Sequence, residues 1–469
     1  MTRYTQIKKL DGPEALREHL DRIGVGLPVS DRVDPSGVLA DSVTFTDGSA
    51  GEFTIANRFA VLPMEGWDGT SDGAPTDLVR RRWSRFGSSG CGLVWGEATA
   101  VHPSGRANPN QLVLDERNAE AIAGLRSLLD PAQVSGLQLT HSGRWCRPVA
   151  DPVPRPAQPH PVLDARQHLR GDEVMSDGEL DELIESYVAA AVRVADAGFD
   201  FVDVKCCHGY LLHELLGARD RSGRYGGDFE GRTRFFRTVV ERIRSERPHL
   251  AVAVRLSAFD FVPFRRGADG VGEPEPTAGA PVPFGGTSDG TSIDLDEPNR
   301  FLDLVGELGI GLVSTTAGSP YTNPHIQRPA YFPPSDGYQP PEDPLVGVAR
   351  QIAATAELRA AHPNLTFVGS GYSYLQDFLP HVADAVAAVG GTDLIGLGRM
   401  ILSYPDLAAD VLDGRPMRRR AICRTFSDCT TAPRAGLVSG CYPLDDFYNE
   451  MPERIELAAI KRRLREQQR

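Results

Sequence analysis

The 469-residue chain lacks several features that would assign it to a particular class of protein. It has no excess of positive charge, because 50 Lys and Arg residues stand against 63 Asp and Glu residues and the net charge at pH 7 is -13. A nucleic-acid-binding protein is expected to carry a basic patch or stripe, so nucleic acid is not an expected partner. The acidic balance indicates solubility rather than a particular ligand.

Long hydrophobic runs are also absent, since no stretch approaches the ~18 consecutive apolar residues of a membrane span. Residues 1–10 have no apolar core of the signal-peptide kind. The seven cysteines are an odd number, spread thinly, and do not resemble a disulfide framework. We therefore expect a cytoplasmic protein with a small-molecule substrate and no membrane partner. Whether it forms a homo-oligomer stays open.

What the chain does contain is a repeated alternation of short apolar runs and helical patterns. Most of the runs are rich in Val, Leu, Ile and Phe, as parallel strands buried on both faces are. The eight strand candidates are Phe59–Pro63, Gly92–Gly96, Gly136–His141, Phe201–Lys205, Ala251–Leu256, Gly311–Thr315, Thr366–Gly369 and Leu394–Gly396. Eight β/α units favour an α/β protein with a closed (β/α)8 (TIM) barrel. A doubly wound sheet is the rival, but no Gly-x-Gly-x-x-Gly opens a helix after a first strand.

The barrel is expected to occupy residues 51–415, between an N-terminal extension of residues 1–50, which could cover the barrel floor, and a C-terminal extension of residues 416–469. Two long loop excursions leave strand carboxyl ends, at Trp145–Val174 and Phe261–Pro298. Loops of this length are usually lids or disordered segments, so both are candidate covers for a site.

Local signals mark the ends of several helices. Ser176-Asp-Gly-Glu179 is typical of a capping box. Gly198 follows the helical run Glu182–Asp196, where a left-handed residue is expected past the helix end. Another helical run, Arg232–Arg247, stops before a proline that cannot continue it.

The most informative stretch begins at Gly198 and ends at Leu212. The apolar run Phe201–Val204 is typical of a buried strand. Its carboxyl end carries the titratable side chains Lys205, Cys206, Cys207, His208 and Tyr210. In a (β/α)8 barrel, residues at that end carry chemistry. We interpret the two cysteines as small residues packed behind the loop.

This stretch resembles the old yellow enzymes, the FMN-dependent ene-reductases of the NADH:flavin oxidoreductase family, whose pattern here is G-F-D-x-V-E-[IV]-H-x-x-H-G-Y-L-L. A second segment, Arg224–Arg234, resembles their D-x-Y-G-G-S-x-E-N-R-x-R. The resemblance implies that His208 anchors a substrate carbonyl, that Tyr210 protonates the α-carbon, and that Lys205 replaces the other anchoring residue. It further implies reduction of an activated alkene by a hydride from flavin N5, driven by NADH or NADPH.

Glycines follow the seventh and eighth strands, where barrels often bind phosphate. Gly369, Ser370 and Gly371 lie after one strand, and Gly398 and Arg399 after the other. Backbone amides can approach a phosphate closely there, and a guanidinium can bind it bidentately. Tight turns alone would also explain the glycines, but the resemblance to the family's G-L-G-R implies the FMN phosphate site.

Two polar residues on predicted strands match the family's flavin-ring ligands. Gln138 lies in a Q-L-x-H-x-G-R match and offers a donor and an acceptor, although a polar residue of the barrel core is the alternative. Arg255 lies in an R-L-S match, which implies a place near flavin N1 and O2. An arginine in the apolar run Ala251–Arg255 is costly unless it is paired, and an anionic cofactor is the simplest explanation.

The first two predicted strands match the family pattern less completely. Pro63 and Met64 resemble the family's P-[ML]-[TC], in which the third residue binds flavin O4, but Glu65 stands at that third position. A carboxylate there would lower the potential of the flavin or be protonated. It could act as an acid or base, bind a hydroxylated substrate, or turn away to the surface. Ala98 matches the small residue against the flavin ring.

Lys205 leaves several roles open: activating a carbonyl, holding a carboxylate, acting as a base when neutral, or pairing with a neighbouring Asp or Glu. Two other functions also stay open. One is an FMN-dependent dehydrogenase or demethylase that oxidises an amine or alcohol, and the other is a flavin-free barrel that binds small molecules.

Three cysteines of the C-terminal extension, Cys423, Cys429 and Cys441, resemble part of the cluster motif C-x2-C-x2-C…C of larger relatives, the trimethylamine dehydrogenase and dienoyl-CoA reductase branch. Phe426 stands where the second ligand belongs. Because four thiolates are the usual set, we do not expect a 4Fe–4S cluster or another metal. Electrons would then come from a pyridine nucleotide, a substrate or a partner protein.

Overall fold

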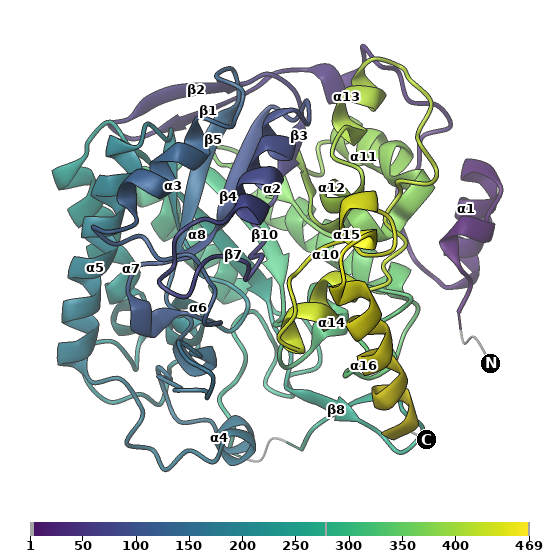
Figure 1. Ribbon diagram of the computed structural model, residues 1–469. Coiled ribbons are helices and arrows are strands. Elements are labelled where there is room, and N and C mark those ends of the chain that lie inside the picture. Colours follow the sequence, from purple (N-terminus) through teal and green to yellow (C-terminus); the bar gives the residue numbers. More distant parts are fainter. Residues whose placement is uncertain (1–3, 277–278, 468–469) are drawn as a thin grey trace.

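The computed structural model describes residues 4–276 and 279–467, and eight parallel strands close into a barrel at its centre (Figure 1). In order around the barrel they are β3 (Phe59–Val61), β4 (Leu93–Ala100), β5 (Val134–Thr140), β6 (Phe201–Val204), β7 (Ala251–Phe259), β10 (Leu312–Ala317), β11 (Thr366–Gly369) and β12 (Leu394–Leu397). β12 pairs with β3 and completes the ring. The predicted strands and the (β/α)8 class are confirmed.

Helices follow the strands and form the outer layer (Figure 1). They are α2 (Asp77–Gly87), α3 (Ala119–Arg126), α5 (Asp177–Asp196), α6 (Leu211–Leu216), α7 (Phe229–Glu246), α8 (Asp296–Glu307), α10 (Pro344–Ala361), α11 (Leu379–Ala388), α12 (Arg399–Ser403) and α13 (Leu407–Leu412). The predicted capping box is confirmed, since Ser176 and Glu179 make both of its hydrogen bonds at the start of α5. Past the end of that helix, Gly198 has the left-handed φ of 79° expected there. No described helix is long and apolar enough to cross a bilayer.

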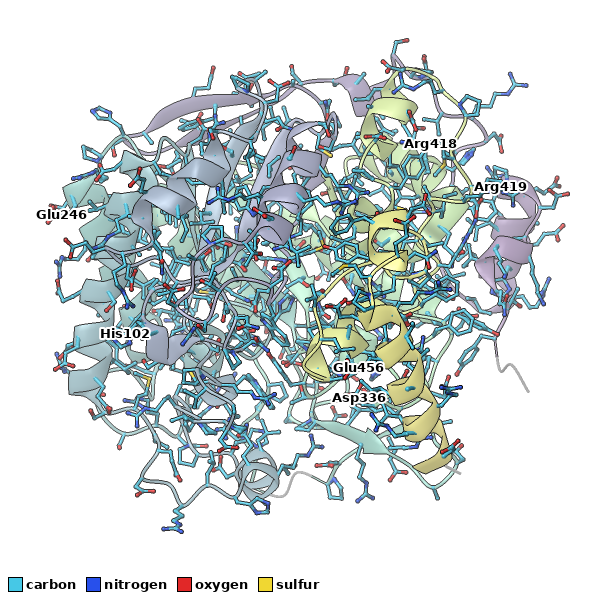
Figure 2. All side chains as sticks on the ribbon, in the orientation of Figure 1. His102, Glu246, Asp336, Arg418, Arg419 and Glu456 are labelled. Atoms are coloured by element: carbon cyan, nitrogen blue, oxygen red, sulfur yellow. The ribbon has the colours of Figure 1, made fainter. Side chains whose placement is uncertain are left out.

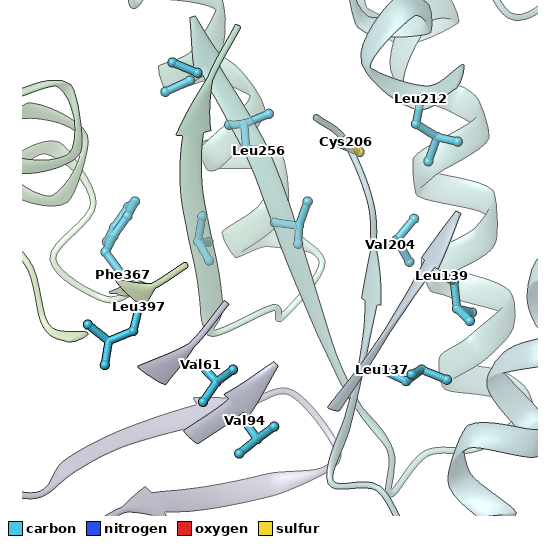
Figure 3. Packing of buried hydrophobic residues seen from close by; sticks show 14 of the residues in the cluster. Val61, Val94, Leu137, Leu139, Val204, Cys206, Leu212, Leu256, Phe367 and Leu397 are labelled. Carbon is cyan, nitrogen blue, oxygen red and sulfur yellow. The ribbon is translucent and has the colours of Figure 1, made fainter. Parts of the chain in front are cut away.

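Alternate residues of each strand pack outward against the helices or inward across the barrel. Figure 3 shows outward residues such as Val61, Leu137 and Leu397 in the main core cluster. Inward residues such as Leu93 and Phe201 form a second cluster at the amino ends of the strands. Side chains two residues apart on a strand share a face. The inward face therefore passes from apolar residues low in the barrel to polar ones at the carboxyl ends.

A hairpin of β1 (Val43–Asp47) and β2 (Gly51–Ile55) closes the barrel floor. Phe45 of this hairpin packs beneath the strands, and Asp47 pairs with Arg244 of α7. The expectation that the N-terminal extension covers the barrel floor thus holds only for its residues in this hairpin. The earlier described residues, including α1 (Gly12–Arg22), run along the outside, where His19 contacts Asp343 beside α10. The hairpin of β1 and β2 spans the predicted boundary between residues 50 and 51. The domain limits stay a prediction.

Both excursions and the C-terminal extension lie at the carboxyl ends of the strands. The first excursion contains α4 (Pro161–Gln167), and the second contains the hairpin of β8 (Phe264–Arg266) and β9 (Gly272–Pro274). The extension forms α14 (Asp428–Arg434), α15 (Asp446–Asn449) and α16 (Glu453–Gln467), drawn in yellow at the front of Figure 1. The C-terminal extension supplies wall residues of the site, and the two excursions line a groove beside it.

Candidate active site

The carboxyl ends of the strands open into a pocket of about 1300 Å³, its mouth included. Twelve of the fourteen predicted site residues line it: Pro63, Met64, Glu65, Gln138, Lys205, His208, Tyr210, Arg255, Ser370, Gly371, Gly398 and Arg399. The other two lie behind its wall. Ala98 is buried beside Gln138, and Gly369 packs against Tyr372 and Thr392.

Three donors converge on the Glu65 carboxylate. Its Oε1 accepts from Lys205 Nζ at 2.9 Å, and its Oε2 accepts from the Tyr210 hydroxyl at 3.1 Å and the Trp67 indole at 2.8 Å. The Lys205 ammonium also lies 3.8 Å from the centre of the Tyr210 ring, in a cation–π contact. Glu65 therefore faces the pocket rather than the surface. Of the alternatives for Lys205, the structure shows pairing with a carboxylate.

Two phenols meet beside this ion pair. The Tyr210 and Tyr321 hydroxyl oxygens are 3.3 Å apart, and the Tyr321 ring stacks on Trp145 with centroids 4.2 Å apart. Burial raises the pKa of Tyr210 well above its usual value, and the Glu65 carboxylate raises it further. Burial also raises the pKa of Tyr321. Both phenols consequently keep their protons at neutral pH.

His208 is held in an unusual backbone conformation after β6. Its φ of 64° lies in the left-handed region, which histidine tolerates better than most residues, and its N–H donates to Ser257 Oγ at 3.0 Å. Its Nε2 lies 3.1 Å from Thr316 Oγ1. Burial lowers the pKa of His208 well below its usual value, and the charges of Arg255 and Lys205 lower it further. The imidazole is therefore neutral and can donate one hydrogen bond.

Asp203 organises the neighbouring strands from inside the barrel. Its Oδ2 accepts from the Trp95 indole at 2.7 Å and from the Gln138 amide at 2.5 Å, and its Oδ1 accepts from the Arg255 N–H at 2.8 Å. Burial raises the pKa of Asp203 to about 6. This carboxylate fixes the orientation of Gln138, and it was not among the predicted site residues, although it shares the inward face of β6 with Lys205.

The Arg255 guanidinium is buried without a carboxylate partner in the described residues. Its Nη1 donates to the Pro63 carbonyl at 3.2 Å, and its Nε has no acceptor there. Burial lowers the pKa of Arg255, which is the expected response of a cation removed from water. An anionic ligand against these unsatisfied N–H groups would remove the penalty.

Two further guanidinium groups, those of Arg328 and Arg399, lie after the sixth and eighth barrel strands. Arg399 donates through Nη2 to the Pro329 carbonyl at 2.7 Å, while its Nη1 is buried without an acceptor in the described chain. Arg328 follows α9 (Pro324–Gln327), and its Nε and Nη2 are likewise buried and unpaired among the described residues. Burial, and then the charges of Arg434 and Arg399, lower the pKa of Arg328 to about 9. Gly371 beside them has a left-handed φ of 98°, which favours glycine.

These unsatisfied donors fit FMN. The two guanidinium groups and the glycine turns match a doubly charged phosphate, and Arg255 matches an electron-rich ring edge. Arg328 was not predicted, since it follows a segment rich in proline without a strand or helix pattern. The extension also contributes wall residues that were not predicted, including Cys429 and Arg434 of α14.

An outer groove adjoins the pocket, and the two share Trp67, Pro320, Tyr321 and Arg434 as wall residues. Both excursions line this groove, the first through residues that include Arg147 and the second through all three residues of β8. The excursions therefore line a groove next to the pocket, and their role as covers of the site stays a prediction.

All seven cysteines are free thiols. Cys206 and Cys207 are fully buried behind the loop, as expected. Cys429 lines the pocket, and Phe426 stacks on Phe332. Within the part of the chain that is described, no three His, Cys, Asp or Glu side chains are arranged to hold a metal ion.

Comparison with known proteins gives concordant matches. The sequence model of the NADH:flavin oxidoreductase / NADH oxidase family matches residues 45–273. The NADH oxidase of Thermoanaerobacter brockii is 25% identical over 413 residues, which cover 84% of this chain and 56% of that protein. The NADPH dehydrogenase of Bacillus subtilis (strain 168) is 26% identical over 371 residues, 78% of this chain and 92% of that one.

Among solved structures, the old yellow enzyme homologue from Zymomonas mobilis has a TM-score of 0.56 at 22% identity, over 81% of this chain and 94% of that one. This is a likeness of fold. The chain spans just over half the length of the Thermoanaerobacter protein and nearly all of the Bacillus protein.

Proposed function

We propose that this chain, whose residues 45–273 match the model of the NADH:flavin oxidoreductase / NADH oxidase family, is an oxidoreductase that binds FMN, takes electrons from NADH or NADPH, and reduces the double bond of a carbonyl-conjugated alkene. One observation carries the proposal. A protonated phenol, Tyr210, and a neutral imidazole, His208, line the same pocket as Gln138 and Arg255.

The pocket residues divide between cofactor and substrate. Pro63, Met64, Gln138 and Arg255 would hold the flavin ring, and Arg328, Ser370, Gly371, Gly398 and Arg399 would hold its phosphate. When bound, FMN supplies the hydride. The fixed charge of Arg255 would favour the electron-rich reduced ring and so raise its reduction potential.

His208 and Tyr210 would act on the substrate. The His208 imidazole would donate to the carbonyl oxygen and draw electron density from the double bond. The Tyr210 hydroxyl would give its proton to the α-carbon. A positioned general acid of this kind typically contributes ~10²–10⁴-fold to the rate. The raised pKa of Tyr210 suits the role, because the phenol keeps its proton until the carbon becomes strongly basic.

Tyr210 must then recover a proton. Its phenolate would stand beside the Glu65 carboxylate, 3.1 Å away in the resting arrangement, and like charges at that distance repel. Tyr321 is the neighbouring hydroxyl at 3.3 Å, and it lines both the pocket and the outer groove. We assign it the return of a proton from groove water to Tyr210. Lys205 would balance the charge of Glu65.

A dehydrogenase that oxidises an amine or alcohol is the second candidate. The observation that favours it is the Glu65 carboxylate itself, which faces the pocket and is linked to Tyr210. A carboxylate is a proton acceptor, so the pair could take the proton that a substrate N–H or O–H gives up as it is oxidised.

Anaerobic mixing separates the candidates. An alkene reductase should be bleached by NADH or NADPH and recover its colour with an alkene, whereas a dehydrogenase should be bleached by an amine or alcohol alone. A protein that neither contains nor takes up FMN would contradict both.

The variant Tyr210→Phe tests the assigned proton donor. It should keep its FMN content and its rate of bleaching by NAD(P)H, while the alkene step slows ~10²–10⁴-fold. Tyr187→Phe is the matched control, because Tyr187 is a fully buried tyrosine of α5 outside the pocket wall. If Tyr210→Phe reduces every alkene at the wild-type rate, the proposed donor is wrong.

A further inference from the structure

The outer groove differs in charge from the rest of the chain. Acidic residues outnumber basic ones overall, 63 to 50, but the groove wall holds only Glu275 and Asp336 as acids. Its six arginines are Arg144, Arg147, Arg166, Arg265, Arg266 and Arg434. Asp336, labelled in Figure 2, is already engaged with Arg434. The groove beside the pocket is thus rich in arginine, although the chain as a whole is acidic.

Four of the six guanidinium groups are paired with carboxylates. Arg144 pairs with Asp164 and Glu214, Arg166 with Glu275, Arg265 with Glu273, and Arg434 with Asp336. These pairs hold the wall in place and leave it little net charge. They are not the groups that would recruit a new anion.

The other two arginines have no carboxylate partner in the described chain. Arg147 donates through Nε to the Ala150 carbonyl at 2.9 Å, and Arg266 donates through Nη1 to the Gly337 carbonyl at 3.0 Å. Both residues are exposed, and they come from different excursions. Each side chain is therefore anchored at one nitrogen while its charge and its remaining N–H groups stay available in the groove.

The groove adjoins the pocket, and Trp67, Tyr321 and Arg434 line both. A ligand that is longer than the pocket and has its reacting end against Tyr210 can extend past Tyr321, which lines both cavities. Its tail would then enter the groove. Guanidinium groups bind phosphate oxygens through paired N–H donors. A phosphate would also supply the negatively charged partner that Arg147 and Arg266 do not have.

We propose that the outer groove binds the phosphate-bearing tail of a nucleotide-type ligand, with Arg147 and Arg266 as its specificity-determining contacts. Two ligands share this chemistry: the dinucleotide reductant, and a substrate carried as an acyl thioester of coenzyme A. The position of the ligand's reacting end against Tyr210 rests on the proposed function. Binding in the groove is measurable without any turnover.

The test compares the double variant Arg147→Ala/Arg266→Ala with wild type and with Arg22→Ala/Arg32→Ala, which removes two exposed arginines outside the groove. Calorimetry on the FMN-loaded protein measures the binding of NAD⁺, NADP⁺ and coenzyme A. We expect the groove variant to lose roughly tenfold in affinity for at least one probe at low ionic strength, because hydrogen bonds to charged groups are the strong ones. Salt should shrink the difference, since exposed charges are screened.

The pattern of losses identifies the ligand. Weaker binding of NAD⁺ and NADP⁺ assigns the groove to the reductant, and weaker binding of coenzyme A alone assigns it to the substrate. A phosphate-free reductant, 1-benzyl-1,4-dihydronicotinamide, should bleach both proteins equally. Equal affinity of the groove variant and wild type for all three probes, or no binding by wild type, overturns the inference. These outcomes differ from failure of the proposed function, which appears as absent flavin or unaltered alkene reduction by Tyr210→Phe.

Discussion

Replacing Glu65 with glutamine tests the central charge arrangement of the pocket. The Lys205 side chain is 3% exposed and the Glu65 side chain is 13% exposed, so their 2.9 Å ion pair is largely removed from water. Glutamine keeps the length of the side chain and an oxygen that can accept from Trp67, but it removes the negative charge. Breaking one side of a buried pair typically costs about 3–5 kcal/mol, because the remaining charge is left uncompensated. We expect Glu65→Gln to lower the free energy of unfolding by about that amount at pH 7.

A double-mutant cycle isolates the pair. Chemical unfolding curves are measured for wild type, Glu65→Gln, Lys205→Met and the double variant. The double variant should recover most of the lost stability, because replacing a whole buried pair is often close to neutral. Glu185→Gln is the matched control, since its partner Arg242 is 39% exposed and such surface pairs contribute about 0–1 kcal/mol.

The same variant has a second, spectroscopic readout. The Glu65 carboxylate helps to raise the pKa of Tyr210, so its removal should lower that pKa while burial still holds it above the usual value. Tyrosine-selective NMR titration follows the shift, with Tyr210→Phe identifying the signal. Stability within 1 kcal/mol of wild type, additive effects in the cycle and an unmoved Tyr210 signal would together refute the charge arrangement described here.

Two further predictions follow from buried hydroxyl and carboxyl groups. Burial raises the pKa of Asp260 to about 7, so the folded state binds its proton more tightly than the unfolded state does, and this contribution to stability is lost as pH rises from about 4 to about 7. Asp260→Asn should flatten the melting-temperature profile over that window, and a profile parallel to wild type would contradict the assignment. Tyr321→Phe should slow the alkene step about tenfold, less than the ~10²–10⁴-fold of the direct proton donor because Tyr321 only returns the proton, and should change the solvent isotope effect of that step. Flavin bleaching by NAD(P)H should not change, and an unaltered isotope effect and rate would leave Tyr321 without a role in proton return.

The barrel could be predicted from the sequence because its strands are unambiguous. Most are short apolar runs buried on both faces, and such runs differ sharply from the amphipathic helices between them. Lys205 could be placed at the site because it directly follows β6, and Arg255 because it lies in β7 within a match to the family's R-L-S. The floor hairpin was not predicted. Val43–Asp47 alternates as a strand should, but a five-residue alternation is a weak signal on its own.

The remaining site residues could not be predicted because their positions depend on tertiary packing. Arg328 follows a four-residue helix, and Arg434 ends a seven-residue helix of the C-terminal extension. Neither segment shows a period that would place it over the barrel. Asp203 lies in a strand that was predicted, but its role depends on three donors from three different strands, and no local sequence pattern indicates that they meet.

The two departures from the family pattern, Glu65 and Lys205, have to be interpreted together. Taken alone, Glu65 would place a negative charge beside a reduced flavin, and Lys205 would place a cation at a substrate anchor. In the structure the two charges lie 2.9 Å apart and largely cancel. If FMN binds as proposed, the ion pair would therefore alter the flavin potential and the substrate anchor less than either residue would alone. What the pair adds is a carboxylate that accepts a hydrogen bond from the Tyr210 hydroxyl, so its principal effect would fall on the proposed proton donor.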